Sequence, residues 1–535
     1  MALLGSRTRR DDTDGDEPPT EESSGSAGEE LRVPLSRASL MVIGVAVGVG
    51  VVARFANDTP LWLDEALSVN IARLPVGEIG EALRHDGHPP LYYYLLHYWM
   101  ALFGESDFAT RALSGVISVA TIPLAWLAGR RFGGRNVAWL TVLVFGVNAF
   151  AIRYADETRM YSLLMLEVFA GYLLVANSLE KPTWPRLGGI FVVSGALLLT
   201  HYWAMYLVAA VGIMLVVRAV RVRQRDDRVA TWKTLGALAA GGVLFLWWVP
   251  TLLYQSAHTG TPWADPERPA TVLIITLQSF AGGARSETQV LALVMVLLVA
   301  AALFARTRSN RRLDLDLWTR HEPRDVAVAL MSTIVIGSAV AYATQSTFQG
   351  RYAAVYFPLF ALLVALGLDR FVPPRTRAVV LSAFLVLSLV AVGFEVTTTR
   401  SQSGEVAGAI VESSPPPEGV IVFCPDQLGP SVERVLPAGY EMVTYPDFED
   451  PLFVDWVDYA ERNAASDPNA FASELVESVD PDTPIFLVFN ENYQTLEEKC
   501  PAVVNALGAT RTPELLVRSD PDEFFEGMSL MKFTS

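Results

Sequence analysis

The sequence predicts an all-α polytopic membrane bundle followed by a small extracytoplasmic α/β domain. Of the 535 residues, 51% are hydrophobic and only 18% are charged, whereas soluble domains carry about 25% charged residues. Apolar runs that approach the roughly 20 residues of a membrane-spanning helix recur until about residue 396. Beyond it, short apolar runs alternate with acidic, helix-like segments. These three observations give the fold class and argue against a large soluble protein.

We divide the chain into three parts. Residues 1–35 begin with MALLGSRTRRDDTDGDEPPTEESSGSAGEE, which reads as a disordered acidic cytoplasmic tail that cannot build a core. Residues 36–398 hold the membrane-spanning part, with a long first extracytoplasmic loop at 57–108. Residues 399–535 form the acidic α/β domain, in which GVIVFC and PIFLVF have the composition of buried strands.

About eleven apolar runs are expected to cross the membrane as helices. Several of them are short, and their boundaries are approximate. They lie at about 36–55, 109–129, 136–152, 159–178, 187–200, 202–217, 232–250, 288–305, 326–344, 353–369 and 378–396.

Basic residues orient this bundle. Loops rich in Arg and Lys stay on the cytoplasmic side of a membrane, and with eleven spans every basic loop falls on one side. The N-terminal tail is then cytoplasmic, whereas the first loop and the C-terminal domain are extracytoplasmic. The basic residues of the inner side are Arg130, Arg131, Arg135, Lys181, Arg186, Arg218, Arg221, Arg223, Arg225, Arg306, Arg308, Arg311, Arg312, Arg370, Arg375 and Arg377.

The apolar run HPPLYYYLLHYWMALFG, residues 88–104, does not fit this count as a further span. It is short and contains His97, and a full crossing would move the basic loop at 130–135 to the outside. We therefore expect a re-entrant or interfacial helix, whose Tyr and Trp side chains suit the lipid headgroup layer.

The formal net charge of −16 limits the classes of partner and environment. Lysine occurs only at positions 181, 233, 499 and 532, and such an acidic, lysine-poor surface suits high salt. We expect a halophilic source, a haloarchaeon; a GC-rich genome that favours Arg over Lys is the plainer alternative. The absence of a basic face argues against a nucleic-acid partner. Cys424 and Cys500 both lie in the extracytoplasmic part, where a disulfide and two free thiols are both open.

Polar side chains that can carry chemistry gather at the outer ends of the spans. They come from the first loop, from the turn RYADETRMYSLL, from THYW and from FQGRYAAVYFP. The candidates are Asp64, Glu65, His88, Glu157, Arg159, Tyr161, His201, Tyr202, Arg351 and Tyr352.

One carboxylate and two arginines suit the transfer of a sugar from a polyprenyl monophosphate. The phosphate is already a good leaving group, so the reaction needs no strong acid. Arginines can bind the phosphate through paired N–H donors and stabilise its developing charge. A single carboxylate can take the proton of the incoming hydroxyl from the opposite face of the sugar. Direct displacement would invert the anomeric carbon.

The same motifs resemble a known family. The Asp-Glu pair after the first span, HPPLYYYLLHYW, YADETRMYSLL and LLTHYWAMYLV together are similar to the GT-C polyprenyl-phosphate-sugar glycosyltransferases. The resemblance covers about residues 36–370 and is strongest to the dolichyl-phosphate-mannose–protein mannosyltransferase-like group, which includes the bacterial aminoarabinose lipid A transferases. It implies that Asp64 is the catalytic base and Glu65 its neighbouring acid. Glu157 and Arg159 match the family's Tyr-x-x-Glu-x-Arg-x-Tyr pattern.

From these observations we expect an integral membrane, inverting glycosyltransferase of the GT-C fold. It would transfer a hexose, mannose being one candidate, from a polyprenyl or dolichyl monophosphate to a lipid-linked glycan or a surface glycoprotein. Asp64 and Glu65 are assigned to catalysis, Arg159, Arg351 and Glu157 to the donor phosphate. The side chains assigned to substrate binding are His88, His201, Tyr161, Tyr202 and Tyr352. No cofactor is expected.

Several alternatives stay open at this stage. A transporter or flippase of lipid-linked sugars would place its substrate groups near the bilayer midplane, and a membrane-anchored binding protein would act through its C-terminal domain. His85, Asp86 and His88 could hold a divalent metal ion, although no complete ligand set is evident. Asp64 could simply cap a helix, and Arg159 could pair with Glu157 or contact lipid headgroups.

Overall fold

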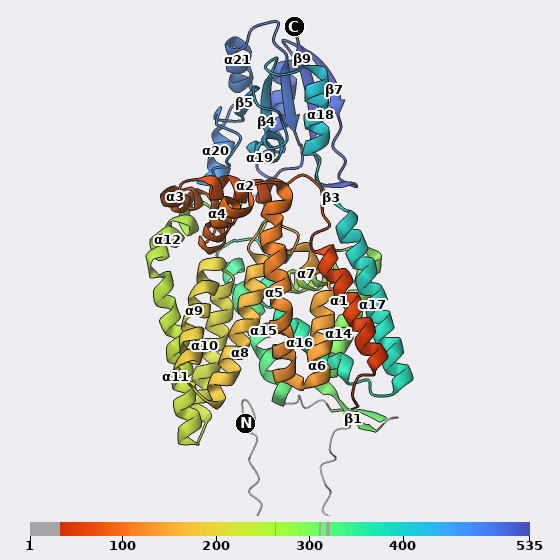
Figure 1. The fold of residues 1–535 in the computed structure, drawn as a ribbon. Helices are drawn as coiled ribbons and strands as arrows, with labels where there is room; N and C mark the ends of the chain where they lie inside the picture. Colours follow the sequence, from red (N-terminus) through yellow and green to blue (C-terminus); the bar gives the residue numbers. More distant parts are fainter. Residues whose placement is uncertain (1–32, 263, 310–311, 317–320) are drawn as a thin grey trace, which may run out of the picture.

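The computed structural model describes residues 33–262, 264–309, 312–316 and 321–535. Figure 1 shows a bundle of long helices, a layer of short helices across one end of it, and an α/β unit on top of that layer. The expected acidic tail lies, up to residue 32, outside the described residues.

Among the described residues, seven helices are long and apolar enough to span a membrane. Their exposed faces are apolar: in α14 and α17 only 28% and 22% of the most apolar window is buried within the protein. Helices suit hydrocarbon because they satisfy their own backbone hydrogen bonds. The seven are α5 (Asp107–Gly133), α8 (Tyr161–Glu180), α10 (Ala204–Arg221), α11 with η1 and α12 (Arg225–Gly241, Gly242–Trp248, Val249–His258), α14 (Ser286–Phe304), α15 (His321–Ala343) and α17 (Pro374–Thr397).

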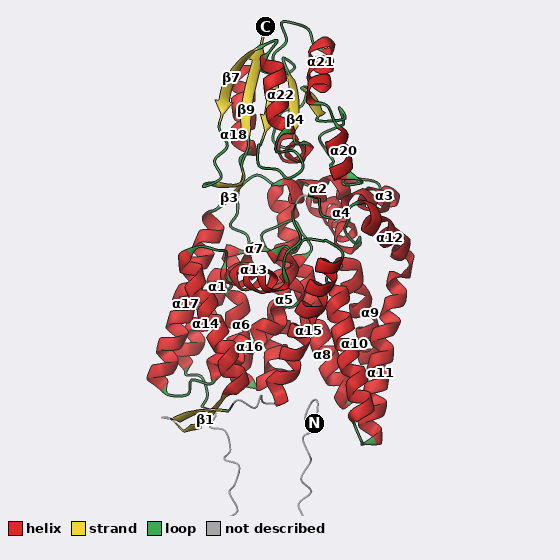
Figure 2. Ribbon diagram, turned by 180° about the vertical axis from the view of Figure 1, so that it is seen from behind, coloured by secondary structure: helices red, strands yellow, loops and turns green. Residues whose placement is uncertain are grey.

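Shorter apolar helices complete the bundle. Each of the eleven expected spans overlaps a helix of one of these two sets, whereas α13 lies inside a segment expected to be a loop. It contacts the short helix α7 (Ala149–Arg153), near the end of the bundle that faces the α/β unit (Figure 2). The shorter apolar helices are α1 (Arg37–Ala53), α6 (Arg135–Gly146), α9 (Trp184–Thr200), α13 (Pro269–Ala281) and α16 (Phe357–Asp369).

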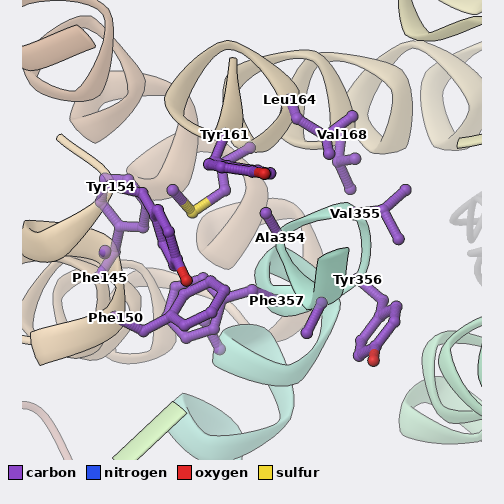
Figure 3. Close-up of a cluster of buried hydrophobic side chains, with 14 of the residues drawn as sticks. Phe145, Phe150, Tyr154, Tyr161, Leu164, Val168, Ala354, Val355, Tyr356 and Phe357 are labelled. Carbon is purple, nitrogen blue, oxygen red and sulfur yellow. The ribbon is translucent and has the colours of Figure 1, made fainter. Parts of the chain in front are cut away.

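Helix α16 forms the centre of the bundle. Every residue from Phe357 to Leu368 is buried, and the helix packs against α14 and α6. Its approach to α14 is close because position 367 is glycine: a Cβ there would lie 2.0 Å from the carbonyl oxygen of Leu298. At the N-terminal end of α16, the rings of Phe150 and Tyr154 pack edge to face, and Phe357 packs at a tilt against Phe150. Figure 3 shows this aromatic cluster around Phe150, Tyr154 and Phe357.

Three short helices lie across the end of the bundle that faces the α/β unit (Figure 1): α2 (Leu63–Arg73), α3 (Val76–Asp86) and α4 (Leu91–Phe103). Helix α4 is the segment expected to be re-entrant or interfacial, and Figure 1 draws it in this layer with α2 and α3. The hairpin of β1 (Ala305–Ser309) and β2 (Arg312–Leu315) lies at the opposite end.

The C-terminal part is an α/β unit built on a mixed five-stranded sheet of order β5-β4-β6-β9-β7. Strands β4, β5 and β6 are parallel, and β9 runs antiparallel to β6 and β7. All residues of β4 and β6 are buried, as expected for strands covered on both faces. The strands are β4 (Val420–Cys424), β5 (Glu441–Thr444), β6 (Ile485–Phe489), β7 (Thr512–Val517) and β9 (Ser529–Thr534).

Helices flank this sheet, and a two-stranded pair connects the unit to the bundle. Strand β3 (Thr399–Ser401) pairs in parallel with β8 (Phe524–Glu526) directly after α17. The two cysteines, whose pairing the sequence left open, form a disulfide between the end of β4 and α22. The helices are α18 (Ser403–Ser413), α19 (Gly429–Glu433), α20 (Tyr459–Ala465), α21 (Pro468–Ser478) and α22 (Lys499–Gly508), with a 3₁₀ turn η3 (Asp426–Leu428) after β4.

The contact between α14 and α16 gives the first testable prediction. In Gly367→Ala the added methyl group would meet a backbone carbonyl, so the two helices must separate. We expect overpacking of this kind to reduce stability by about 1–3 kcal/mol, measured as a lower melting temperature of the detergent-purified protein. Gly393→Ala in α17 is the matched control, because nothing lies within 4 Å of its added Cβ. Equal melting temperatures for both variants would contradict this packing.

Candidate functional site

Helix α2 presents two neighbouring carboxylates, Asp64 and Glu65, in different directions. Successive residues of an α-helix are rotated by about 100°, so the two side chains cannot share one environment. Glu65 is completely buried, whereas 15% of the Asp64 side chain is exposed. Asp64 lines the large cavity described below, and Glu65 does not.

Glu65 is the centre of a buried network of ion pairs. Arg111 in α5 donates from Nη2 and Nε to its two carboxylate oxygens, at 2.6 and 2.8 Å. The backbone N–H of Thr158 donates to Oε1 at 2.9 Å, and Arg400 Nη1 lies 3.6 Å away. Burial alone would raise the pKa of Glu65, but these partners lower it to about 2. The geometry favours a permanently charged anchor of α2 and lends no support to the catalytic role predicted for Glu65.

Asp64 lies between the two arginines that the sequence assigned to the donor phosphate. Its Oδ2 is 2.9 Å from Nη1 of Arg351 and 3.8 Å from Nη2 of Arg159. Arg351 belongs to η2 (Gly350–Val355), and Arg159 to the turn before α8. The three residues are far apart in sequence, and they meet because the first turn of α2, the turn before α8 and η2 lie side by side at the cavity.

A chain of hydrogen bonds fixes the orientation of Arg159. Its Nη1 donates to Ser68 Oγ at 2.9 Å and to Tyr93 Oη at 3.2 Å, and its Nη2 lies 2.9 Å from Nε2 of His88. On the other side of the His88 ring, Nδ1 is 2.9 Å from Asp86 Oδ2. Burial raises the pKa of Asp86, but His88 and Arg159 bring it below its usual value. Asp86 therefore stays charged, and it favours the tautomer in which His88 accepts from Arg159.

Three further predicted substrate-binding residues, His201, Tyr202 and Tyr352, also line the cavity. The His201 ring lies 5.0 Å from that of Tyr352 and 6.5 Å from that of His88. Burial, and then the neighbouring cationic groups, lower the pKa of His201 well below its ordinary value, so its imidazole is neutral. The Tyr202 hydroxyl is hydrogen-bonded to Gln255 of α12.

Glu157 and Tyr161 lie behind the cavity wall. Glu157 is buried, with Oε2 at 3.7 Å from Arg400 and 3.9 Å from Arg153. Tyr161 is fully buried with its ring 4.8 Å from that of Tyr154, in the aromatic cluster of Figure 3. Neither lines the cavity. The Tyr161 ring nevertheless lies 5.9 Å from that of His201, which does line it, so Tyr161 backs the wall near the candidate site, whereas Glu157 is held by Arg400 and Arg153.

The cavity has a volume of about 780 Å³ and lies where the bundle, the α2–α4 layer and the α/β unit meet. Both of its walls combine apolar and polar side chains, and on the bundle side the polar ones include Gln255, Thr259 and Gln345. The bundle side includes Trp203, Met205, Tyr206, Leu252 and Val340; the α/β side includes Gln427, Trp456, Asn490, Asn492, Tyr493, Gln494, Phe525 and Glu526.

The α/β unit also holds the first turn of α2 directly. Glu526 Oε1 accepts the backbone N–H of Leu63 at 3.0 Å, and its Oε2 accepts from Ser401 Oγ at 2.5 Å. The Phe525 ring meets that of Trp62 edge to face at 5.1 Å. Burial raises the pKa of Glu526 to about 7, although these hydrogen bonds lower it. A carboxylate at a helix N-terminus stabilises the helix, here the helix that carries Asp64.

The described residues offer no group of three or more His, Cys, Asp or Glu side chains that could hold a metal ion. His85, one of the three residues weighed as metal ligands, is hydrogen-bonded to Asp455 at 2.9 Å. Both ring nitrogens of His88 have hydrogen-bond partners, Asp86 and Arg159.

Sequence reasoning missed four residues that shape the site: Arg111, Arg400, Ser68 and Glu526. Arg111 carried a usable signal, because an arginine at the outer start of an apolar run opposes the orientation rule and needs a buried partner. The other three carried none: their partners lie far away in sequence, 463 positions in the case of Leu63 and Glu526.

Comparisons with known proteins show a family match for part of the chain and a shared fold for most of it. Residues 87–249 match the family model described as dolichyl-phosphate-mannose-protein mannosyltransferase. The crystal structure of ArnT from Cupriavidus metallidurans in the apo state shares the fold with a TM-score of 0.60 at 12% identity, over 92% of this chain and 98% of that chain. ArnT bound to undecaprenyl phosphate gives 0.56 at 13% identity, with the same coverage. No curated protein sequence gives a significant match.

The shared fold and the apolar helices define the class: this chain is a multi-pass membrane protein of the GT-C fold. Over residues 87–249 it is similar to the dolichyl-phosphate-mannose-protein mannosyltransferase family.

The buried network of Glu65 can be tested by stability. Glu65→Gln leaves Arg111 without its anionic partner, and breaking a buried ion pair in this way costs about 3–5 kcal/mol. The pKa of Glu65 is lowered from 4.5 to about 2, so its contribution is complete above about pH 4.5 and is lost as the pH falls toward 2. The melting-temperature difference between wild type and variant should therefore be constant from pH 8 to pH 5 and shrink below pH 4.5.

Glu105→Gln serves as the control for this prediction, because it removes an ion pair with Arg73 whose side chains are 50% and 37% exposed. Such surface pairs contribute little. A Glu65→Gln protein as stable as the control variant would show that the network does not anchor α2.

Proposed function

We propose that this protein is an inverting glycosyltransferase that takes a hexose from a polyprenyl or dolichyl monophosphate and transfers it to an acceptor hydroxyl outside the cytoplasm. The acceptor would be a lipid-linked glycan or a surface glycoprotein. The observation that carries the proposal is Asp64, which lies within 4 Å of Arg159 and Arg351 at the wall of a cavity bounded by membrane helices.

In this mechanism the two arginines bind the donor phosphate. The charge of Asp64 balances that of Arg351, and an incoming phosphate would compete for the same guanidinium group. Because Arg159 is fixed by Ser68, Tyr93 and His88, it can receive the phosphate with little reorganisation, which is the condition for effective electrostatic stabilisation.

Asp64, released from Arg351, would act as general base. The acceptor oxygen forms a bond to the anomeric carbon while the bond from that carbon to the phosphate oxygen breaks. The acceptor proton goes to Asp64, and the electron pair stays on the leaving phosphate, where Arg159 and Arg351 hold the charge. Attack opposite the leaving group inverts the anomeric configuration.

Apolar side chains on the bundle side of the cavity suit the carrier lipid. Trp203, Met205 and Tyr206 of the α10 region and Val340 of α15 face the cavity from the bundle. A polyprenyl chain could lie along this wall with its phosphate at the arginines. The shared fold with ArnT, which has been crystallised with undecaprenyl phosphate, supports a carrier of this chemical class.

The orientation follows from the basic loops. Arg130 and Arg131 lie in the last turn of α5, and Arg221 ends α10. These helix ends lie at the end of the bundle opposite the α/β unit (Figure 1). By the positive-inside rule that end is cytoplasmic. The cavity and the α/β unit would then face the exterior. Polar groups concentrated at one end of the bundle also favour an enzyme over a transporter with a midplane site.

The role of Asp64 is tested by Asp64→Asn. The amide keeps the size of the side chain but cannot take a proton, so we expect transfer to fall by about 10²- to 10⁴-fold, with the melting temperature little changed. The assay incubates the purified protein with polyprenyl-phosphate sugars and a membrane extract as acceptor source, and follows release of the carrier by mass spectrometry. Asp58→Asn, an exposed carboxylate of the same loop, should remain fully active. Normal turnover by Asp64→Asn would refute the role of Asp64 as general base.

The phosphate-binding role is tested separately by direct binding of undecaprenyl phosphate. Arg159→Ala and Arg351→Ala each remove charge-assisted hydrogen bonds worth about 1.5–3 kcal/mol, so affinity should fall roughly 10- to 100-fold. Arg351→Lys should retain part of the affinity, since it keeps the charge without the paired donors. Arg73→Ala, at an exposed ion pair, is the control. Unchanged affinity for undecaprenyl phosphate in both alanine variants would contradict phosphate binding by the two arginines.

A further inference from the structure

The α/β unit turns the carboxyl ends of its parallel strands β4 and β6 toward the cavity. In the order β5-β4-β6, the chain leaves β4 for β5 on one side, and β6 lies on the other side of β4. Since all three strands are parallel, β4 and β6 border the point where the connections diverge. In open α/β sheets, ligands bind in the crevice at the carboxyl ends of the strands at such a point.

The loops at this crevice line the cavity. The turn η3 after β4 contributes Gln427, and the segment after β6 contributes Asn490, Asn492, Tyr493 and Gln494. The crevice of the α/β unit and the cavity that contains Asp64 are therefore one continuous space. Burial raises the pKa of the Tyr493 hydroxyl, and the charges of Glu526 and Asp64 raise it further, in line with a position facing the candidate base.

Internal hydrogen bonds hold this loop in shape. Asn490 donates from its side-chain amide to the carbonyl of Gly527 at 2.6 Å, and its amide oxygen accepts the backbone N–H of Asn492 at 2.8 Å. Gln494 reaches across to Asp265 of the bundle at 3.3 Å. The side chain of Asn492 is exposed, so it can contact a ligand without breaking these bonds.

We propose that this wall, formed by Gln427, Asn492, Tyr493 and Trp456, is the acceptor subsite, and that it takes a neutral, hydroxyl-rich glycan. The proposal rests on the proposed function, because Asp64 would deprotonate the hydroxyl that the subsite presents. A primary amide offers a donor and an acceptor to adjacent sugar hydroxyls. The exposed Asn492 supplies this pair, whereas Gln427 is buried and donates to Tyr459 Oη at 3.1 Å. Aromatic rings with a polar tip offer an apolar face to sugar C–H groups and a hydrogen bond at the edge.

The charges of the cavity select against an anionic acceptor. Among the described lining residues, the Lys and Arg side chains are two arginines, Arg159 and Arg351. Both lie within 4 Å of Asp64, where they would bind the donor phosphate. The wall of the α/β unit adds a carboxyl group, Glu526, and no Lys or Arg among the described residues. An acceptor with phosphate or sulfate groups would meet no cation on this wall, whereas a neutral glycan needs none.

The same wall is a poor site for an extended peptide. Peptides commonly bind by adding a strand to an exposed sheet edge. The edge strands of this sheet are β5 and β7, and the described lining residues include none from either strand. The observations therefore favour the glycan over a peptide as the group recognised here.

The test measures glycan binding to the full chain in lipid nanodiscs by saturation-transfer NMR. The probes are mannotriose, maltotriose and cellotriose as neutral glycans, a heparin disaccharide as the anionic probe, and a Ser- and Thr-rich nonapeptide. We expect at least one neutral trisaccharide to bind, and the anionic probe and the peptide not to bind. Asn492→Ala with Tyr493→Ala should weaken the trisaccharide at least tenfold and leave undecaprenyl phosphate binding unchanged. Asn492→Ala alone, at an exposed position, should give part of the loss.

Two controls separate this inference from the proposed function. Asn505→Ala removes an exposed amide of α22 outside the cavity lining and should bind like wild type. Asp64→Asn should bind the trisaccharide normally, so loss of the base and loss of the subsite give different results. Binding of none of the three trisaccharides, binding of the anionic probe or the peptide in their place, or trisaccharide binding unchanged in the double variant would each overturn the assignment.

Discussion

The buried ion pair between Glu65 and Arg111 is the interaction on which the candidate site depends. It joins α2 to α5, and through Thr158 and Arg400 it also holds the turn before α8 and the segment that enters the α/β unit. Because a helix separates neighbouring side chains by about 100°, burying Glu65 on one side turns Asp64 toward the cavity. The two adjacent acids thus have different environments: Glu65 is buried with Arg111, whereas Asp64 lines the cavity, where a substrate can reach it.

The site also depends on contacts between parts of the chain that are distant in sequence. The bundle supplies Arg159 and Arg351, the short-helix layer supplies Asp64, and the α/β unit supplies Glu526, which accepts from the first turn of α2. The α/β unit therefore does two things in our account: it stabilises the helix that bears the base, and it forms the wall proposed for the acceptor. Loss of this unit would affect both the geometry at Asp64 and the choice of acceptor.

The sequence predicted the general arrangement well because it rests on strong, local signals. Apolar runs located each expected helix, and the alternation of basic loops brought Asp64, Arg159 and Arg351 to one end of the bundle, where the structure places them within 4 Å. Helix α13 was missed because its 13 residues lie in a mixed segment. Glu65 was assigned to catalysis and Glu157 to the donor phosphate by motif alone, since periodicity cannot show that Arg111 pairs with Glu65 and that Arg400 lies near both carboxylates. The disulfide between Cys424 and Cys500 could not be predicted either, because the fold of the α/β unit brings the end of β4 to α22 and the spacing of the two cysteines does not show this.

A structure of the wild-type protein with undecaprenyl phosphate bound would test the central claim most directly. Our account requires the phosphate oxygens to lie within hydrogen-bonding distance, about 3 Å, of the guanidinium groups of both Arg159 and Arg351, with the carboxylate of Asp64 released from Arg351 and facing the cavity. A phosphate bound elsewhere in the bundle, with the contact between Asp64 and Arg351 intact, would contradict it.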